Sequence, residues 1–230
     1  GLYNIYNTLA AITTASALQV EWSPIVSGIE QFKPAFGRGE RIQVEGRTMR
    51  LLLAKNPAGF NEVLRTLFSD ATPRHVLFVL NDNIADGRDI SWIWDVDFER
   101  ALGSVPMAVL AGSRAFDLAL RLKYAGFSQE DVTIVTSAPL RAARQNGRLK
   151  QQQRRISRNG NAGEQVTASM LNHTPVATRY GIAEALNIAI RQTPVGETLF
   201  VVPTYTGLLE VHRELERRGL TPHYWDEKGP

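Results

Sequence analysis

The sequence predicts an α/β protein with a mostly parallel, doubly wound sheet that is preceded by two helices. In the last two thirds of the chain, apolar runs of strand length alternate with segments whose apolar residues recur at helical spacing. The first 36 residues show helical spacing alone. In such a sheet, ligands are expected beyond the carboxyl ends of the strands.

The elements expected in the first third are helices at 4–18 and 23–32, a hairpin of strands 40–46 and 48–54, and a helix at 56–70. Ser23 can cap the second helix, and Pro24 suits the first helical position. Pro57 has the same place in the helix after the hairpin. The remaining elements are strands at 75–80, 106–112, 131–137 and 197–203, and helices at 96–102, 114–126, 180–192 and 206–219.

Composition sets the class of protein. The chain has 230 residues, of which 43% are hydrophobic and 21% charged, enough for one large domain or one domain with an appendage. It has no run of 18 apolar residues, so we expect no membrane span. It starts without Met or a basic leader, so we expect no signal peptide and expect that the chain was cut from a longer protein. Cysteine is absent, which excludes disulfides, zinc-thiolate sites and a cysteine nucleophile.

One segment, 140–161, carries seven Lys and Arg residues and no acid, so removing it changes the net charge from +3 to −4. It lies in a predicted insertion at about 138–177, between a strand and a helix. The positive charge of this segment could bind the phosphates of a nucleic acid, and nucleic-acid binding is therefore one alternative function. It could also attract an anionic lipid surface. The segment has no aromatic residue for base stacking, which argues against specific nucleic-acid binding.

The stretch "LNDNIADGRDISWIWDVDFE", 80–99, follows a predicted buried strand and holds six acidic residues, one Arg and two Trp. Its oxygen donors resemble a calcium loop, but the spacing and closing Glu of an EF-hand are missing. The residues can also serve only as turn and cap formers. Against that reading, so many carboxylates close together at the edge of an expected crevice cost Coulomb energy.

The chain lacks the phosphate-binding, dinucleotide-binding, zinc-protease and serine-hydrolase motifs. A dehydrogenase would therefore rest on fold analogy alone. The four histidines are scattered along the chain, which disfavours a histidine-based site. A carboxylate can orient a catalytic histidine. Because this chain offers no nucleophile, the nucleophile and the histidine would belong to another subunit.

Four motifs now resemble a known family: "GLYNIYNTLAA", "FGRGE", "AKNPAGFNEVLR" and "NDNIADGRDISWIWDVDFE". Together they look like the C-terminal part of the MurT family, the Mur-ligase-like subunits of lipid II isoglutaminyl synthase. The likeness runs from residue 1 to about 137 and from about 177 to 218, leaving out the basic insertion. It implies a Rossmann-like fold of the Mur ligase C-terminal type, with 1–36 as the closing helices of the central domain and 37–230 as the C-terminal domain.

The resemblance also implies an activity. The complete enzyme uses ATP with Mg²⁺ to activate the α-carboxylate of D-Glu in the stem peptide of lipid II, and ammonia from a GatD-like glutaminase then forms the amide. In the family, the Asp that closes "DGRD" completes the glutaminase triad, which places that role on Asp89. The isolated domain is expected to be inactive, and the protein to act in the cytoplasm at the inner face of the cell membrane. No resident metal is expected in this chain.

By the same resemblance, Asn7 contacts adenine and Arg38 contacts nucleotide phosphates or bridges domains. An amide can pair with the edge of adenine, and a guanidinium binds phosphate oxygens through two donors. Lys55 and Asn56 are further candidates for nucleotide contact. The sequence departs from many Mur ligases here, because Leu52 replaces an Asp and Lys55 replaces a His.

The remaining residues of the acidic stretch are expected to shape it. Asp86, Gly87 and Arg88 would present Asp89, while Trp92 and Trp94 would anchor the loop and the surface that faces the glutaminase. The acids that follow are expected to form the first turn of the short helix, where the helix dipole favours them, and they are Asp95, Asp97 and Glu99.

Overall fold

The computed structural model describes residues 2–32, 37–70, 72–136, 177–178 and 181–221. The strands are β1 (Arg38–Val44), β2 (Arg47–Leu52), β3 (His75–Val79), β4 (Ala108–Ala111), β5 (Val132–Thr136), β6 (Ala177–Thr178) and β7 (Thr198–Pro203). The α-helices are α1 (Leu2–Ala17), α2 (Trp22–Glu30), α3 (Pro57–Leu67), α4 (Ala115–Tyr124), α7 (Gly181–Gln192) and α8 (Tyr205–Arg217). Two 3₁₀ turns, η1 (Ser91–Asp95) and η2 (Phe98–Ala101), lie between β3 and β4.

The strands form one sheet in the order β1-β2-β7-β3-β4-β5-β6. Among the strands of the described residues, only the pairing of β1 with β2 is antiparallel. Strand β7, the last in sequence, lies between β2 and β3, so the order of the strands reverses beside β3. The predicted doubly wound, mostly parallel α/β fold is confirmed, and its ligand crevice is expected at this reversal.

The predicted hairpin is formed by β1 and β2. Glu45 and Gly46 connect the strands with φ values of 47° and 73°. Two successive residues with positive φ are typical of the two-residue turn whose twist matches that of the flanking strands.

Two helix starts can be compared with the sequence. Asn56 caps α3, accepting a hydrogen bond on Oδ1 from the backbone N–H of Gly59 (2.8 Å), and Pro57 begins the helix as expected. Helix α2 begins at Trp22, so the prediction that Ser23 caps it was wrong. Pro24 still lies in the first turn, where the backbone nitrogen needs no partner within the helix.

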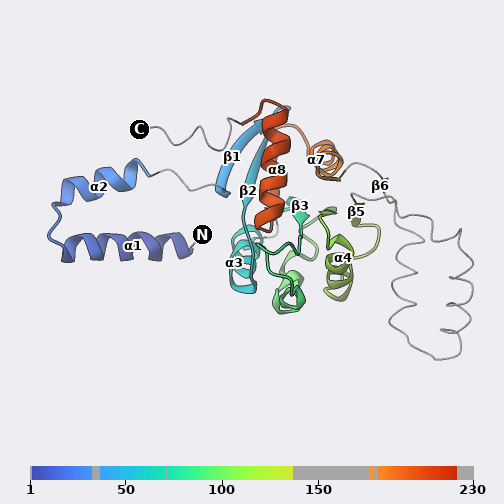
Figure 1. Cartoon of the computed structure of the whole chain (residues 1–230), viewed down its shortest axis with the longest axis horizontal. Helices are drawn as coiled ribbons and strands as arrows, with labels where there is room; N and C mark the ends of the chain where they lie inside the picture. The colour runs from blue at the N-terminus through green and yellow to red at the C-terminus, as the bar shows by residue number, and fades with distance from the viewer. Residues whose placement is uncertain (1, 33–36, 71, 137–176, 179–180, 222–230) are drawn as a thin grey trace, which may run out of the picture.

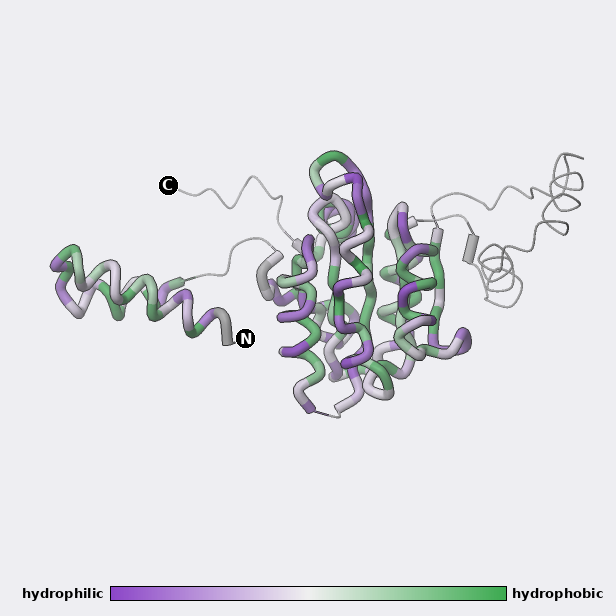
Figure 2. The backbone as a smooth tube through the Cα atoms, turned by 90° about the horizontal axis from the view of Figure 1, so that it is seen from below, coloured by the Kyte–Doolittle hydropathy of each residue, from purple (hydrophilic) through white to green (hydrophobic). Residues whose placement is uncertain are grey.

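Two apolar cores cover the two faces of the sheet. Alternate residues of β3 point to opposite faces, so that Val76 and Phe78 join the core under α3 and α4, while Leu77 and Val79 join the core under α7 and α8. Figure 1 shows these two helix layers. In Figure 2 the strands between them are largely hydrophobic.

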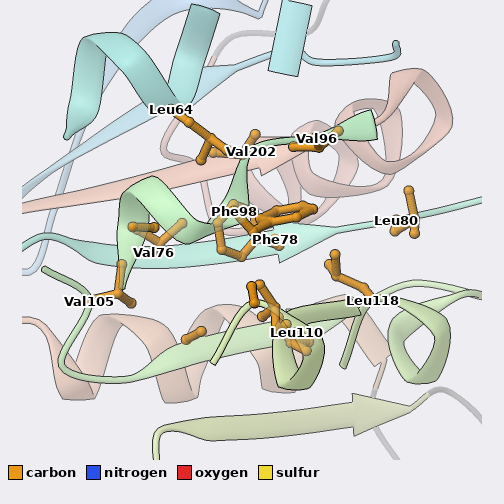
Figure 3. Close-up of a cluster of buried hydrophobic side chains, with 14 of the residues drawn as sticks. Leu64, Val76, Phe78, Leu80, Val96, Phe98, Val105, Leu110, Leu118 and Val202 are labelled. Atoms are coloured by element: carbon orange, nitrogen blue, oxygen red, sulfur yellow. The ribbon is translucent and has the colours of Figure 1, made fainter. Parts of the chain in front are cut away.

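An aromatic cluster fills the core under α3. The ring of Phe98 lies 5.2 Å from that of Phe60 and 5.9 Å from that of Phe78, and both contacts are edge to face. Figure 3 shows Phe78 and Phe98 among the aliphatic side chains of this core. Trp92 packs against Phe60 at 6.1 Å, so the acidic stretch is attached to the core through its own aromatic residues.

Helices α1 and α2 contact each other and lie outside the layers of the sheet (Figure 1). These helices and the residues that directly follow them expose many large apolar side chains: Ile5, Tyr6, Leu9, Leu18, Val20, Trp22, Ile29 and Phe32. Within the described ranges, no helix is both long and apolar enough to cross a membrane.

We predict that Phe98→Ala lowers the free energy of unfolding by about 3–5 kcal/mol, because it leaves a cavity among packed rings. Leu102→Ala is the matched control, since Leu102 is 48% exposed in the same segment. Its effect should stay within about 0.5 kcal/mol. Urea unfolding measures both, and equal effects would contradict the packing described for Phe98.

Candidate functional site

The acidic stretch leaves the carboxyl end of β3, beside the carboxyl ends of β4 and β7. The backbone N–H of Leu80 donates to the carbonyl of Ala111 (3.0 Å), and that of Thr204 donates to the carbonyl of Val79 (2.9 Å). The chain therefore enters the loop while it is still bonded to both neighbouring strand ends. This is the edge of the sheet at which the reversal of strand order predicts a ligand site.

Asn81 is buried, and each of its side-chain groups has a partner. Its Oδ1 accepts from the backbone N–H of Ser113 (2.9 Å), while its Nδ2 donates to Oγ1 of Thr206 (3.0 Å) and to Oε1 of Glu210 (3.2 Å). Its backbone N–H donates to Oγ1 of Thr204 (3.1 Å). Asn81 thus joins the loops that follow β3, β4 and β7.

Asp86 attaches the loop to the start of α8. Its Oδ1 accepts from the backbone N–H of Thr206 (2.8 Å), and its Oδ2 accepts from the hydroxyl of Thr206 (2.5 Å) and from the backbone N–H of Asn83 (3.2 Å). A carboxylate at a helix N-terminus is stabilised by free backbone N–H groups and by the helix dipole. Asp86 is therefore held inside the protein rather than presented to a partner.

Asp82 attaches the loop to the start of α4. Its Oδ1 accepts from the hydroxyl of Ser113 (2.8 Å), and its Oδ2 accepts from Nε of Arg114 (2.9 Å). The hydrogen bond from Ser113, followed by the bond and charge of Arg114, lowers the pKa of Asp82. This carboxylate is therefore ionised and committed to a structural pair.

Arg121 holds the other end of the stretch. This buried residue donates from Nε to the carbonyl of Ile93 (3.3 Å) and from Nη2 to that of Val96 (2.6 Å), and it pairs with Glu99 (2.9 Å). Its guanidinium also lies 5.8 Å from the ring centre of Trp94. The two 3₁₀ turns are thereby fixed to α4.

Asp89 lies between these attachments and is exposed. Its Oδ1 accepts from the backbone N–H of Ser91 (2.8 Å), and this bond, together with one from the side chain of Ser91, lowers the pKa of Asp89. Gly87 turns the chain with φ 91°, and Arg88 is exposed beside it. The result is an ionised carboxylate presented to solvent from a loop that is fixed on both sides.

The two tryptophans divide their roles. Trp92 is partly buried against Phe60, whereas Trp94 is 49% exposed and makes an edge-to-face contact with Tyr124 at 5.6 Å. Trp92 anchors the loop, and Trp94 contributes apolar surface near it. Whether that surface meets a partner stays a prediction.

The acids at 95–99 do not form the first turn of an α-helix, because the segment folds into the turns η1 and η2 instead. The short helix expected here is the 3₁₀ turn η2, and Glu99 lies in its first turn, whereas Asp95 ends η1 and Asp97 precedes η2. Asp97 pairs with Arg100 (3.5 Å) and Glu99 pairs with Arg121, while Asn61 bonds the backbone of Asp95 and Asp97. Side-chain pairs, rather than a helix end, offset these charges.

The predicted nucleotide contacts do not form one cluster. Asn7 is exposed on α1, and Lys55 is exposed after β2 at the carboxyl edge of the sheet. Asn56 already caps α3. Arg38 begins β1, opposite Leu52, and its side chain lies outside the described residues.

A metal site and a histidine site can also be compared with the structure. In the described ranges, no group of three or more His, Asp and Glu residues could hold a metal ion. His75 pairs with Glu197 (3.0 Å), and His212 pairs with Glu40 (2.9 Å), both away from Asp89. The histidines at 173 and 223 and the basic segment 140–161 lie outside the described residues.

Thr206, Glu210, Ser113 and Arg121 contact the loop and were not expected from the sequence. The available signal was topological, because Thr206 and Ser113 directly follow strands whose carboxyl ends flank β3. Arg121 lies within an ordinary amphipathic helix pattern and gave no signal.

Comparison with known proteins shows what this chain is similar to. Residues 53–158 match the family model described as MurT ligase C-terminal. The chain is 37% identical over 134 residues to the lipid II isoglutaminyl synthase (glutamine-hydrolyzing) subunit MurT of Streptococcus pneumoniae strain R6, which is 58% of this chain and 30% of that protein. The protein of the same name from Staphylococcus aureus strain COL is 39% identical over 126 residues, 54% of this chain and 29% of the relative.

Solved structures support the fold. A crystal structure of MurF from Acinetobacter baumannii aligns with a TM-score of 0.57 at 19% identity, covering 94% of this chain and 38% of that one. MurC from Thermotoga maritima aligns with a TM-score of 0.50 at 14% identity, covering 95% and 38%. The chain thus spans about a third of the length of these relatives.

The pKa of Glu210 provides a test of the contacts around Asn81. Burial raises the pKa of Glu210, and the nearby charge of Asp86 adds to this, while the bond from Asn81 and the charge of Arg213 lower it. A raised pKa in the folded protein means that the contribution of Glu210 to stability is fully present below its ordinary value of 4.5 and is lost as pH rises through the folded value.

We therefore predict that Glu210→Gln is more stable than the wild type at neutral pH, because Gln keeps an acceptor for Asn81 without a buried charge. The difference should shrink as pH falls toward 4.5. Thermal unfolding across this pH range measures it, with the exposed Glu130→Gln as control. The stability difference between Glu210→Gln and the wild type is compared at pH 8 and at pH 4.5. A difference that favours Gln less at pH 8 than at pH 4.5 would contradict the partly buried environment of Glu210.

Proposed function

Because residues 53–158 match the family model described as MurT ligase C-terminal, we propose that the chain is part of the ATP-dependent subunit of a lipid II isoglutaminyl synthase. In this proposal the complete enzyme amidates the α-carboxylate of D-Glu in the stem peptide. A GatD-like glutaminase supplies the ammonia, and the isolated domain is inactive.

The observation that carries the proposal is the presentation of Asp89. The carboxylate is exposed and ionised, it lies between two fixed points, and the chain has no cysteine that could act as the nucleophile of a glutaminase. Such a group can complete a site whose nucleophile and histidine belong to another protein. The names of the relatives, which include "glutamine-hydrolyzing" and "subunit", agree with this role.

In the proposed mechanism, the carboxylate of Asp89 accepts a hydrogen bond from Nδ1–H of the partner's catalytic histidine. This bond fixes the tautomer and stabilises the imidazolium that forms when the histidine takes the thiol proton. The thiolate attacks the amide carbon of glutamine, the imidazolium gives its proton to the amide nitrogen, and the C–N bond breaks to release ammonia and leave a thioester. Water then releases glutamate from the thioester and restores the thiol.

The second reaction in the proposal is the ATP-dependent activation of the D-Glu carboxylate. When bound, ATP with Mg²⁺ would supply the phosphoryl group that activates the D-Glu carboxylate, and ammonia would then displace phosphate from the activated group. The exposed ammonium of Lys55 before the N-terminus of α3 suits contact with phosphate oxygens. We assign supporting contacts to Asn7 and Arg38, whereas Asn56 acts first as the cap of α3.

The chain divides into residues 1–36 and 37–230 in this proposal. The exposed apolar side chains of α1 and α2 suit helices that close the central ATP-binding domain of the complete protein. In this proposal, that domain holds most of the nucleotide and its Mg²⁺.

We predict that Asp89→Asn in the complete complex lowers glutamine hydrolysis by about 10³- to 10⁴-fold, since the amide would favour the wrong tautomer of the histidine. The subunits should still associate. Asp97→Asn is the matched control on the same stretch, because Asp97 is exposed and pairs with Arg100. Glutamate release and size-exclusion chromatography measure the outcome, and near wild-type turnover in Asp89→Asn would falsify the triad role.

The basic segment 140–161 suits attraction to the anionic membrane surface that carries lipid II. Each Lys or Arg near such a surface contributes about 1 kcal/mol. None of the relatives reported above is named as a nucleic-acid-binding protein.

Replacing the seven basic residues of 140–161 with Gln should therefore reduce binding to vesicles that contain phosphatidylserine. Binding to neutral phosphatidylcholine vesicles should be weak for both proteins. Vesicle co-sedimentation measures this, and equal binding of the two proteins to anionic vesicles would refute the proposed contact.

A further inference from the structure

Asp89 lies in the middle of a short segment that is attached to the rest of the protein at both ends. Three residues before it, Asp86 is bonded to the start of α8, and four residues after it, the carbonyl of Ile93 accepts from Arg121. Ser91 constrains the carboxylate itself. The position of Asp89 therefore depends on these attachments, and neither of them touches its side chain.

The upstream attachment is centred on one hydroxyl. Oγ1 of Thr206 donates to Oδ2 of Asp86 (2.5 Å) and accepts from Nδ2 of Asn83 (2.8 Å) and Nδ2 of Asn81 (3.0 Å). Three residues of the loop thus share a single group on α8. A methyl group of the same size could not replace it, because two amide donors and one carboxylate oxygen would each lose a partner.

Thr206 is itself fixed by close packing of α8 on the sheet. A Cβ atom at the next residue, Gly207, would lie 2.8 Å from Cγ1 of Val79, the last residue of β3. The backbone N–H of Thr206 also donates to Asp86. The hydroxyl therefore occupies a defined place relative to the strand from which the loop departs.

We propose that Thr206 is a positioning residue for the glutaminase reaction, holding the loop so that the carboxylate of Asp89 meets the partner's histidine. This inference rests on the proposed function of Asp89. Thr206 lies outside the part of the chain that matches the family model. Its role follows from the hydrogen bonds at the carboxyl ends of β3 and β7.

The test uses Thr206→Val in the complete complex, with Thr206→Ser as the conservative variant. We expect kcat for glutamine hydrolysis to fall on the order of ten- to a hundredfold, because small misplacements of a catalytic group have effects of that size. KM for glutamine should not change, since the partner binds glutamine. Amidation of lipid II driven by added ammonium should also be unchanged, and Thr206→Ser should restore hydrolysis.

Thr193→Val is the matched control. Thr193 is fully buried and its hydroxyl donates to the carbonyl of Ala189 (2.8 Å) in α7, so the variant also loses a buried hydroxyl. It should affect the melting temperature without a selective loss of glutamine hydrolysis. The comparison separates loss of stability from loss of position.

The remaining outcomes contradict the inference in distinguishable ways. If Asp89→Asn is inactive while Thr206→Val hydrolyses glutamine normally, the positioning role fails and the proposed function stands. If Thr206→Val loses ammonium-driven amidation in parallel with hydrolysis, or if Thr206→Ser does not restore hydrolysis, the hydroxyl has only a structural role. If Asp89→Asn retains hydrolysis, the proposed function fails and the positioning role fails with it.

Discussion

The buried amide of Asn81 is the constraint on which the rest of the site depends. A buried amide is costly unless its donors and acceptor are satisfied. Here its oxygen is bonded by the loop after β4, and its nitrogen by the hydroxyl of Thr206 and the carboxyl of Glu210 on α8. Satisfying this one side chain fixes the relative positions of three loops at the reversal of strand order, where a ligand or partner is expected.

Two glycines make that convergence possible. A Cβ atom at Gly112 would lie 2.3 Å from the carbonyl oxygen of Leu80, and one at Gly207 would lie 2.8 Å from the side chain of Val79. The loops after β4 and β7 can therefore approach the end of β3 closely enough to bond the acidic stretch. The exposed carboxylate of Asp89 gains its fixed position from buried contacts, and its own side chain stays free to meet another molecule.

Much of the fold could be predicted from the sequence, because apolar runs and helical spacing are local signals. The buried strands, the hairpin at Gly46 and the helix that begins at Pro57 all follow from them. The short helix expected at 96–102 is the 3₁₀ turn η2 at Phe98–Ala101, and the contacts of that segment with Arg121 and Asn61 on other elements could not be predicted. The partner of Asp86 could not be predicted either, since Thr206 lies 120 residues away and no local pattern connects them.

In the proposed function, the exposed carboxylate of Asp89 is the part of a catalytic site that this chain contributes, and the chain itself has no thiol. A structure of the complete complex measures the missing relation directly, as the distance between a carboxylate oxygen of Asp89 and Nδ1 of the glutaminase's catalytic histidine. The account predicts a hydrogen bond of about 2.6–3.2 Å. A histidine that is bonded to a carboxylate of the glutaminase itself, with Asp89 out of contact, would contradict it.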